Sequence, residues 1–427
     1  MAAVADQAQP PITLEQGVRE AVRGSAQVRA ARAALETARA QAERDRPIAR
    51  PTVTAIASGT AQGPRVDFQQ PDGQLATVLP EAVGRLDLII EQPLYRAGLG
   101  PARERYSAER TAAELEYRKA VADLVLALRK AFIDVLRADA GVRAARDGVD
   151  AAERSRKLVD DRVAAGQARP IDAQTAQAQS AEAQAALTQA EGSASLARYS
   201  LNRLLGRALR EPIAVAAVED APAVPASPDE AVARGLRGRP ELLLLDQNLV
   251  SARAGIALAR SQTQPSVTAR GQLTEQTPSA FLHEHYYAAT LEVRWPLSDG
   301  GKSRQDAREA RSQADRVEAL LDDARQGIGL DVLHAWESMR AAQGRISLAR
   351  VQRDADEAAE LVAEKAYEVG RGTILEVQAA QREVRAARAA ELSALYDLHA
   401  ANADFLYAQG DALNGLAVSP AGHGGRP

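Results

Sequence analysis

The chain of 427 residues contains no cysteine, which excludes disulfide bonds, zinc–thiolate sites and cysteine nucleophiles. Aromatic residues make up only 4% of it, whereas Ala, Gln, Arg and Glu are abundant. Small side chains let helix axes approach each other closely, and this composition is typical of long helices rather than of a mixed globular core. The scarcity of large side chains therefore predicts a mainly helical protein.

The sequence also lacks a run of about 18 apolar residues, so we expect no transmembrane helix. Its first seven residues, Met1-Ala-Ala-Val-Ala-Asp-Gln, contain neither the basic nor the apolar region of a signal peptide. We therefore expect either a cytosolic protein or one whose signal has been removed. The formal net charge is only −4 and the charges are interspersed, so nothing suggests a nucleic-acid partner.

What the chain does contain is an internal duplication. Residues 13–55 align without a gap with residues 227–269, and the match resumes later at an offset of 203–204 residues. Matched segments include Arg23-Gly24 with Arg237-Gly238, and Gln92-Pro93-Leu94 with Trp295-Pro296-Leu297. A duplication this long predicts two copies of a helix–hairpin–helix module. The expected divisions are a first repeat over 12–210, a Pro-rich linker over 211–228, a second repeat over 229–410 and a disordered tail over 411–427.

Six helices are expected, and each repeat opens on a helix-start signal. Thr13 with Gln16, and Ser227 with Glu230, fit a capping box, in which residues three apart exchange hydrogen bonds around the first turn. Two very long helical runs are predicted at roughly 101–165 and 302–369. At about 1.5 Å per residue, each would span on the order of 100 Å.

Four short segments alternate apolar and polar residues with a period of two, which predicts strands with one face of each kind. They lie at about 52–60, 83–92, 266–275 and 286–295, and residues 59–84 and 276–285 are expected to form hairpin loops. In the second strand, Leu86, Leu88 and Ile90 share one face, while Asp87 and Glu91 lie on the other. This alternation suits the wall of a membrane β-barrel.

One chain supplies only four such strands, and lipid does not tolerate unpaired backbone edges. A barrel would therefore have to close between chains, and three copies would give twelve strands, which points to a cyclic homotrimer. The alternative is that the strands are edge hairpins of a soluble coiled-coil protein.

Several motifs carry a resemblance to a known family. They are Thr13-Leu-Glu-Gln-Gly-Val, Gln92-Pro-Leu-Tyr, Asn202-Arg-Leu-Leu-Gly, Arg239-Pro-Glu-Leu, Trp295-Pro-Leu-Ser-Asp-Gly-Gly and Tyr367-Glu-Val-Gly-Arg-Gly-Thr-Ile-Leu-Glu-Val. Over about residues 12–410 the chain resembles the TolC-like outer-membrane efflux channel proteins, the outer-membrane component of tripartite efflux or type I secretion systems. The first turn, Ala164 to Asp172, departs more from the family pattern than the second, and no N-terminal Cys is present for the lipid anchor of some members.

The resemblance implies a mainly α channel-tunnel with membrane β-strands. A long α-helical coiled-coil barrel would cross the periplasm, and a trimeric 12-stranded β-barrel would lie in the outer membrane of a Gram-negative bacterium, in contact with its lipid. The implied function is an exit duct for small molecules, as in multidrug efflux, that is coupled through a periplasmic adaptor to an inner-membrane efflux pump or ABC exporter. We expect no enzyme activity, cofactor or nucleic acid. The alternative is a periplasmic coiled-coil adaptor or scaffold without its own pore, although no lipoyl-like β-rich segment flanks the helices.

The resemblance also assigns site residues. Glu376 matches a position where the family often places an acidic residue at the tunnel constriction, and Asp172 is its counterpart in the first repeat. A ring of carboxylates there would favour cations; alternatively, each is a solvated carboxylate at a helix start. Arg169 and Arg371 could bridge to these acids and hold the tip closed.

The turns that join the long helices are the expected adaptor-docking tips, with residues Gly166, Gly370, Arg371, Gly372 and Thr373. Four aromatic residues at strand ends mark the expected membrane interface, with core packing as the alternative: Tyr95, Tyr286, Tyr287 and Trp295. The sequence His283-Glu284-His285 would place two imidazoles on one strand face. No further ligand is evident nearby, so we expect no metal site.

Overall fold

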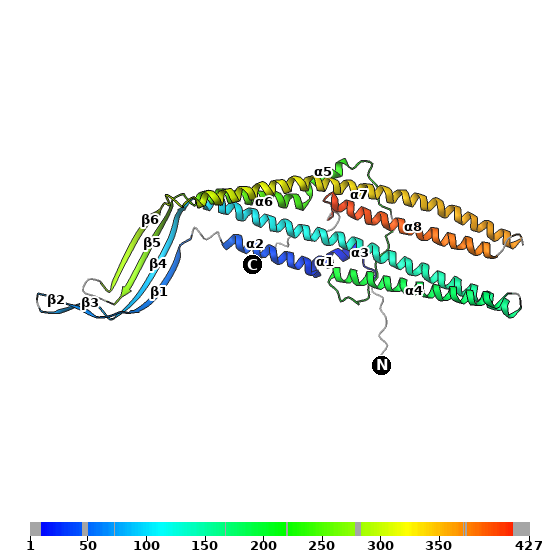
Figure 1. The fold of residues 1–427 in the computed structure, drawn as a ribbon, viewed down its shortest axis with the longest axis horizontal. Coiled ribbons are helices and arrows are strands. Elements are labelled where there is room, and N and C mark those ends of the chain that lie inside the picture. Colours follow the sequence, from blue (N-terminus) through cyan, green and yellow to red (C-terminus); the bar gives the residue numbers. More distant parts are fainter. Residues whose placement is uncertain are drawn as a thin grey trace, which may run out of the picture. The chain divides into compact units, whose positions relative to one another are not determined.

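The computed structural model describes residues 10–44, 50–71, 73–166, 168–218, 221–277, 283–369, 371 and 374–412. Its elements are α1 Leu14–Gly24, α2 Ala26–Arg44, β1 Thr52–Ala61, β2 Val66–Gln69, β3 Leu75–Leu79, β4 Ala82–Arg96, α3 Leu99–Ala164, α4 Pro170–Leu205, α5 Asp229–Gly238, α6 Pro240–Ser261, β5 Ser266–Gln276, β6 His285–Arg294, α7 Lys302–Glu368 and α8 Ile374–Ala408 (Figure 1). The order helix, helix, strand, strand, long helix, helix occurs twice. Only the β2–β3 hairpin lacks a counterpart among the described residues of the second half.

Eight described helices replace the six that the sequence predicts, because the first helix of each repeat is interrupted. Ser25 ends α1 with an extended backbone (φ −61°, ψ 130°), and Arg239 ends α5 in the same way (φ −68°, ψ 126°). Arg239 precedes Pro240, and proline disfavours helical backbone in the residue before it. No proline follows Ser25, so the local sequence does not predict the end of a helix there.

The capping box predicted at Thr13 is confirmed. The Thr13 backbone N–H donates to Gln16 Oε1 at 3.0 Å, and the Gln16 N–H donates to Thr13 Oγ1 at 3.3 Å. The one predicted at Ser227 is wrong. The helix begins after Pro228, and the Ser227 hydroxyl instead bonds to the Asp229 carboxylate (2.7 Å) and accepts from the Asp229 N–H (3.2 Å). The Ser227 hydroxyl therefore bonds to a carboxylate two residues away and does not form the predicted capping box.

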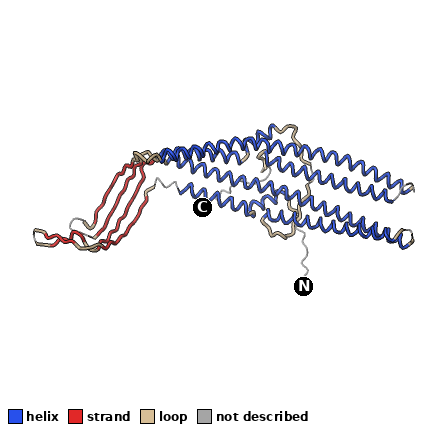
Figure 2. The backbone as a smooth tube through the Cα atoms, in the orientation of Figure 1, coloured by secondary structure: helices blue, strands red, loops and turns tan. Residues whose placement is uncertain are grey.

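The four long strands form one antiparallel sheet in the order β1-β4-β5-β6, so the hairpins of the two repeats join along β4 and β5 (Figure 2). β4 runs beyond the predicted end at residue 92, with an irregular register between Pro93 and Tyr95. Proline has no N–H to donate to a neighbouring strand, which accounts for this irregularity. Residues 59–84, predicted to be a loop, contain β2 and β3, which pair as a separate two-stranded ribbon. Thr77 of β3 donates across the ribbon to the Asp67 carboxylate at 2.9 Å, and the nearby Arg65 side chain donates to the same carboxylate at 2.9 Å.

Contacts divide the chain into two units, and each unit takes segments from both repeats. The first contains residues 1–34, 114–243 and 322–427, and the second contains residues 35–113 and 244–321. In the first unit, α7 packs against α8 around fully buried Val332, Met339 and Leu398. Alanines fill much of the rest of this core, in line with the small-residue composition of the chain.

A pair of glycines lies at the same place in each repeat, where the ends of two helices meet in the first unit. A Cβ atom on Gly206, whose φ is +80°, would lie 2.6 Å from the carbonyl oxygen of Gly24. In the second repeat, a Cβ on Gly410, with φ +83°, would lie 3.3 Å from the carbonyl carbon of Gly238. The sequence alignment pairs Gly24 with Gly238 and Gly206 with Gly410. The duplication therefore extends to the left-handed glycine at this helix end, but only the first-repeat contact is too close for a Cβ atom.

The segment between the repeats contains no helix or extended strand among its described residues, 211–218 and 221–228. It is nevertheless attached to the first unit. Ile12 exchanges backbone hydrogen bonds with Ala214 and Ala216, at 2.9 and 3.0 Å, and Trp336 Nε1 donates to the Pro225 carbonyl at 2.9 Å. Of the predicted tail, residues 413–427 lie outside the described residues.

Among the described residues, one helix, α6, is long and apolar enough to cross a membrane, whereas we expected no such helix from the sequence. Within the second unit, however, α6 lies beside other helices. The Ser251 hydroxyl bonds to Glu109 of α3 at 3.3 Å, and Arg253 pairs with Glu318 of α7 at 3.5 Å. These polar contacts show that α6 packs beside α3 and α7 in the second unit.

Candidate functional site

The four-stranded sheet exposes its apolar side chains. Eight of them share one face and are 37–82% exposed: Val53, Leu86, Leu88, Ile90, Leu273, Tyr287, Leu291 and Val293. On the opposite face, Asp87 is only 8% exposed and Thr274 only 3%. Proteins in water bury apolar groups and expose polar ones, so the polarity of this sheet is inverted. An exposed apolar face of this size needs a covering other than water.

The opposite face of the sheet carries a connected polar network. The Asp87 carboxylate accepts hydrogen bonds from Thr274 Oγ1 at 2.6 Å, Gln272 Nε2 at 2.9 Å and Arg85 Nε at 2.8 Å. Arg85 also donates to the Tyr286 hydroxyl at 3.3 Å. These bonds satisfy the polar groups and join β4, β5 and β6. A face of this kind suits contact with water inside a channel.

The four predicted interface aromatics are all exposed, which disagrees with the core-packing alternative. They do not share one face. Tyr287 lies on the apolar face opposite Leu273, whereas its neighbour Tyr286 lies on the polar face with Arg85. Tyr95 and Trp295 lie where the sheet meets the helices.

The backbone geometry of the turn at the first tip explains why residue 166 is a glycine. Gly166 has φ +76°, in the left-handed region that favours glycine, and its N–H donates to the Val163 carbonyl at 3.0 Å. Close by, the Arg169 N–H donates to Asp172 Oδ2 and the Arg169 guanidinium donates to Oδ1, each at 3.0 Å. The bridge predicted between these two residues is therefore present. The hydrogen bond from the Arg169 side chain, followed by that from its backbone N–H, lowers the pKa of Asp172.

At the second tip, Gly370, Gly372 and Thr373 lie outside the described residues. The Arg371 N–H donates to the Ala366 carbonyl at 2.8 Å, and Glu376 lies exposed in the first turn of α8. Among the described residues, no group of three or more metal-binding side chains occurs, and His283 and His285 are exposed.

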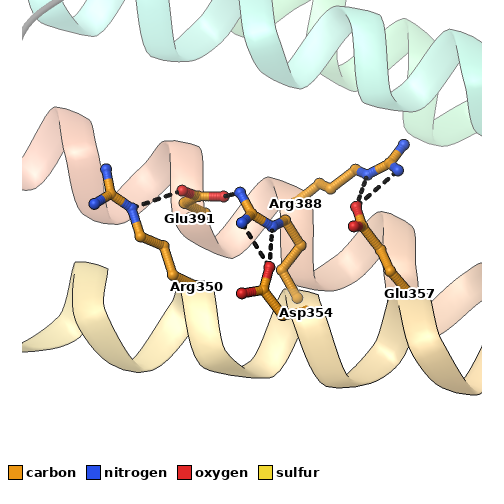
Figure 3. A network of polar contacts seen from close by, with 6 residues as sticks. Arg350, Asp354, Glu357, Arg388 and Glu391 are labelled. Carbon is orange, nitrogen blue, oxygen red and sulfur yellow. Dashed lines mark hydrogen bonds and ion pairs between the residues drawn. The ribbon is translucent and has the colours of Figure 1, made fainter.

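Ion pairs connect α7 to α8 on the way to this tip (Figure 3). Glu391 of α8 binds both Arg350 at 3.1 Å and Arg353 at 2.6 Å, and Arg388 binds Glu357 at 2.8 Å. Single exposed ion pairs contribute little free energy. Because two arginines share Glu391, this network fixes the register of the two helices more than it stabilises them.

The helix α7 has two apolar faces. Val332, Met339 and Ile346 are buried against the rest of the first unit. On the other side, Leu330 and Leu348 are both 68% exposed; they lie eighteen residues apart, which is about five full turns. Leu330 and Met339 are nine residues apart, or about two and a half turns, and so point in opposite directions. Val351 and Val362 continue the exposed face, which we call the outer stripe.

A buried polar cluster forms around Arg239, a residue whose sequence context predicts only a family motif. Its guanidinium, 8% exposed, binds Glu241 at 3.1 Å and Asp331 of α7 at 2.8 Å. It also lies over the Tyr407 ring of α8, 5.0 Å from the centroid. The Tyr407 hydroxyl bonds to Asp123 of α3 at 2.5 Å and to Glu241 at 3.1 Å. We call these five residues the Arg239 cluster.

The environment fixes the charges within the Arg239 cluster. Burial, reinforced by the hydrogen bond to Asp123, raises the pKa of Tyr407 far above its usual range, so the phenol stays protonated. Burial, the largest single cause, would raise the pKa of Glu241, but the hydrogen bond and positive charge of Arg239, together with the hydrogen bonds from its own backbone and from Tyr407, outweigh it and the net pKa is lowered. No local sequence signal marks the cluster, although the duplication does set Arg239 and Glu241 apart from their uncharged counterparts in the first repeat, Ser25 and Gln27.

Comparison with known proteins agrees with this architecture. The model of the outer membrane efflux protein family matches residues 17–207 and 232–410, one segment in each repeat. Protein CyaE of Bordetella pertussis is 28% identical over 221 residues, which are 50% of this chain and 46% of that protein. The pyoverdine export outer membrane protein OpmQ of Pseudomonas aeruginosa is 26% identical over 324 residues, 69% of this chain and 65% of that protein. Both matches span less than two thirds of the relative's length.

The solved structure of the outer-membrane channel OprN superposes with a TM-score of 0.76 at 23% identity, covering 93% of this chain and 90% of that one. At this identity the likeness establishes the fold, which is that of the TolC-like channel-tunnel proteins. The family match covers most of both repeats and confirms the resemblance that the duplicated motifs carry. The chain belongs to the outer membrane efflux protein family.

Proposed function

We propose that the protein is an outer-membrane channel-tunnel, an exit duct for small molecules across the periplasm and the outer membrane of a Gram-negative bacterium. The inverted sheet is the observation that carries this proposal. Its apolar face suits lipid, and its polar network suits a water-filled lumen. The names of OpmQ, an export protein, and OprN, an outer-membrane channel, point in the same direction.

The alternative of a periplasmic adaptor or scaffold without a pore is less favourable. A soluble scaffold would leave the apolar face of the sheet in water, at a cost that scales with its area. The exposed Leu88, Leu273 and Leu291 therefore favour the channel.

The proposed assembly is a homotrimer. The sheet of one chain has open edges at β1 and β6, which must be paired inside a membrane. Three copies would pair these edges in a 12-stranded barrel. The outer stripe of α7, opposite its buried face, gives the helical part a second apolar surface for a neighbouring copy. Energy for transport would come from an inner-membrane pump or exporter reached through a periplasmic adaptor.

The first prediction concerns this assembly. We expect light scattering, corrected for detergent, to show a homotrimer that needs detergent to stay in solution. The double variant Leu330→Glu/Leu348→Glu should dissociate to monomers, because it places charges in the outer stripe. Gln343→Glu, an exposed position on α7 outside the stripe, serves as the control and should stay trimeric. A wild-type monomer in plain buffer, or a double variant that remains trimeric, would contradict the proposed assembly.

A second prediction concerns the tips, where we propose that the adaptor docks. Gly166→Val forces a β-branched residue into a left-handed backbone, which L-residues adopt at a cost of about 1–2 kcal/mol. We expect weaker adaptor co-purification and reduced efflux, with trimer assembly unchanged. Ala165→Val, at the adjacent exposed position, should behave like the wild type. Normal docking by Gly166→Val would show that the adaptor does not recognise this turn.

A third prediction concerns the constriction, which we propose is lined by Glu376. Three copies around one axis would attract cations in a narrow pore. Glu376→Gln should lower cation selectivity and weaken block by polyvalent cations in planar-bilayer recordings. Asp172→Asn should have a smaller effect, because Asp172 is engaged by Arg169 in its own helix turn. Unchanged selectivity and block in Glu376→Gln would leave Glu376 as an ordinary helix-start carboxylate.

A further inference from the structure

Four arginines gather in the second unit where the helices meet the sheet. Arg260, at the end of α6, and three residues in the first turns of α7 line a hollow of about 350 Å³; the three are Arg304, Arg308 and Arg311. No carboxylate of the described residues lines this hollow. None of the four guanidinium groups has an ion pair with the part of the chain that the structure describes. The cluster is therefore an exposed concentration of positive charge whose guanidinium groups are not paired with a carboxylate of the described residues.

Positive charges at the N-terminal end of α7 are electrostatically unfavourable. The helix has no acidic residue in its first turn, although helix N-termini carry partial positive charge and favour acidic side chains. The first backbone N–H groups are already satisfied, because Asp299 accepts from Gly301 at 2.9 Å and from Ser303 at 2.7 Å. An anion in this hollow would therefore bind the arginine side chains rather than the helix end.

From the sheet to the arginine cluster, the residue types change in the same order as the chemical layers of one half of a bilayer. Leu291 and Val293 are exposed on the apolar face of β6, and exposed Trp295 and Leu297 follow in the connection to α7. Hydrocarbon, aromatic interface and charged headgroup occur in the same order in a membrane. Arg311 lies nine residues into α7, about 14 Å from the helix start, and its flexible side chain can reach back toward the interface.

We propose that this arginine cluster binds the phosphate of an anionic phospholipid headgroup in the leaflet on the helix side of the sheet. The proposal rests on the proposed function, because it requires the sheet to lie in a membrane. Guanidinium groups bind phosphate oxygens through paired, charge-assisted hydrogen bonds, and several of them converge on this hollow. Binding would anchor the channel at a fixed depth and neutralise the start of α7.

The test is a titration of the purified full-length protein in detergent with phosphatidylglycerol, followed by native mass spectrometry. Phosphatidylcholine and inorganic phosphate are titrated in parallel. We expect phosphatidylglycerol to bind in preference to both. The triple variant Arg304→Gln/Arg308→Gln/Arg311→Gln should bind phosphatidylglycerol on the order of a hundredfold more weakly, from about fivefold for each arginine near an anionic lipid.

A matched variant controls for the loss of charge. Arg143→Gln/Arg162→Gln/Arg382→Gln removes three exposed arginines elsewhere and should bind the lipid like the wild type. Equal binding by both triple variants would overturn the proposal. Inorganic phosphate that binds as strongly as the lipid would identify a small-anion site, and altered ion selectivity with normal lipid binding would place the arginines in the pore; either result contradicts it. Bilayer conductance of the wild type tests the proposed channel separately.

Discussion

Gly206→Ala is expected to destabilise the folded protein by about 2–5 kcal/mol. Alanine at φ +80° costs roughly 1–2 kcal/mol in the left-handed region. The new Cβ would also lie 2.6 Å from the carbonyl oxygen and 2.7 Å from the carbonyl carbon of Gly24, and these backbone atoms cannot rotate away. Overpacking of this kind adds about 1–3 kcal/mol. The measurement is thermal unfolding of the detergent-solubilised protein by circular dichroism.

Substitutions at two further glycines separate the cost of backbone strain from the cost of overpacking. Gly410→Ala has the same backbone strain, but its nearest contacts are 3.3–3.5 Å, so it should be destabilised less. Gly192→Ala lies in α4 with no atom within 4 Å of the new Cβ, and there alanine should be neutral or stabilise by up to about 1 kcal/mol. The expected order of stability is Gly192→Ala, then Gly410→Ala, then Gly206→Ala. Equal effects at Gly206 and Gly192 would mean that the helix ends separate without cost.

The features that the sequence predicts well are local or periodic. Alternation at Leu86, Leu88 and Ile90 predicts both the strand and its outward apolar face, because a strand places every second side chain on one side. The Arg169–Asp172 bridge was also predictable, since the two residues are three positions apart in one turn. Long helices follow from stretches that contain no proline beyond the first turn, and α3 and α7 end close to where they were expected.

The features that the sequence misses depend on distant partners. Nothing near Ser25 indicates a helix break, whereas the structure shows Gly24 against the backbone of Leu205 and Gly206. Tyr407 bonds to Glu241 across 166 positions and to Asp123 across 284. A single sequence carries no record of such pairs, so Arg239 could be placed in a family motif but not in a buried cluster. Which face Tyr286 and Tyr287 occupy likewise required the strand register.

Arg239→Met is expected to cost on the order of 3 kcal/mol, the low end of the range for breaking a buried ion pair by removing one partner. Methionine keeps much of the side-chain volume, so the loss is mainly electrostatic. The variant leaves the Glu241 carboxylate without its main cation and removes the contact with Asp331. The control is Arg325→Met, because Arg325 pairs with Asp322 in an exposed turn of α7 at 2.8 Å. Exposed pairs contribute about 0–1 kcal/mol.

The pH dependence of stability distinguishes lost charge pairing from lost packing. In the wild type the folded-state pKa of Glu241 lies below its ordinary value of 4.5, so ionised Glu241 stabilises the fold above that pH. The stability is lost as the pH falls through the lowered folded-state pKa. Without Arg239, burial dominates and raises this pKa above 4.5. Glu241 then destabilises the fold when ionised, so Arg239→Met should become more stable relative to the wild type as the pH falls from 7 toward 4.

Thermal unfolding of both proteins between pH 4 and pH 8 measures this difference. The double variant Arg239→Met/Glu241→Gln should recover part of the lost stability at pH 7, because it removes the unpaired buried charge. Its stability should also lose the added dependence on pH. A constant difference between Arg239→Met and the wild type across the whole range would mean that Arg239 acts through its contacts with the Tyr407 ring rather than through its charge.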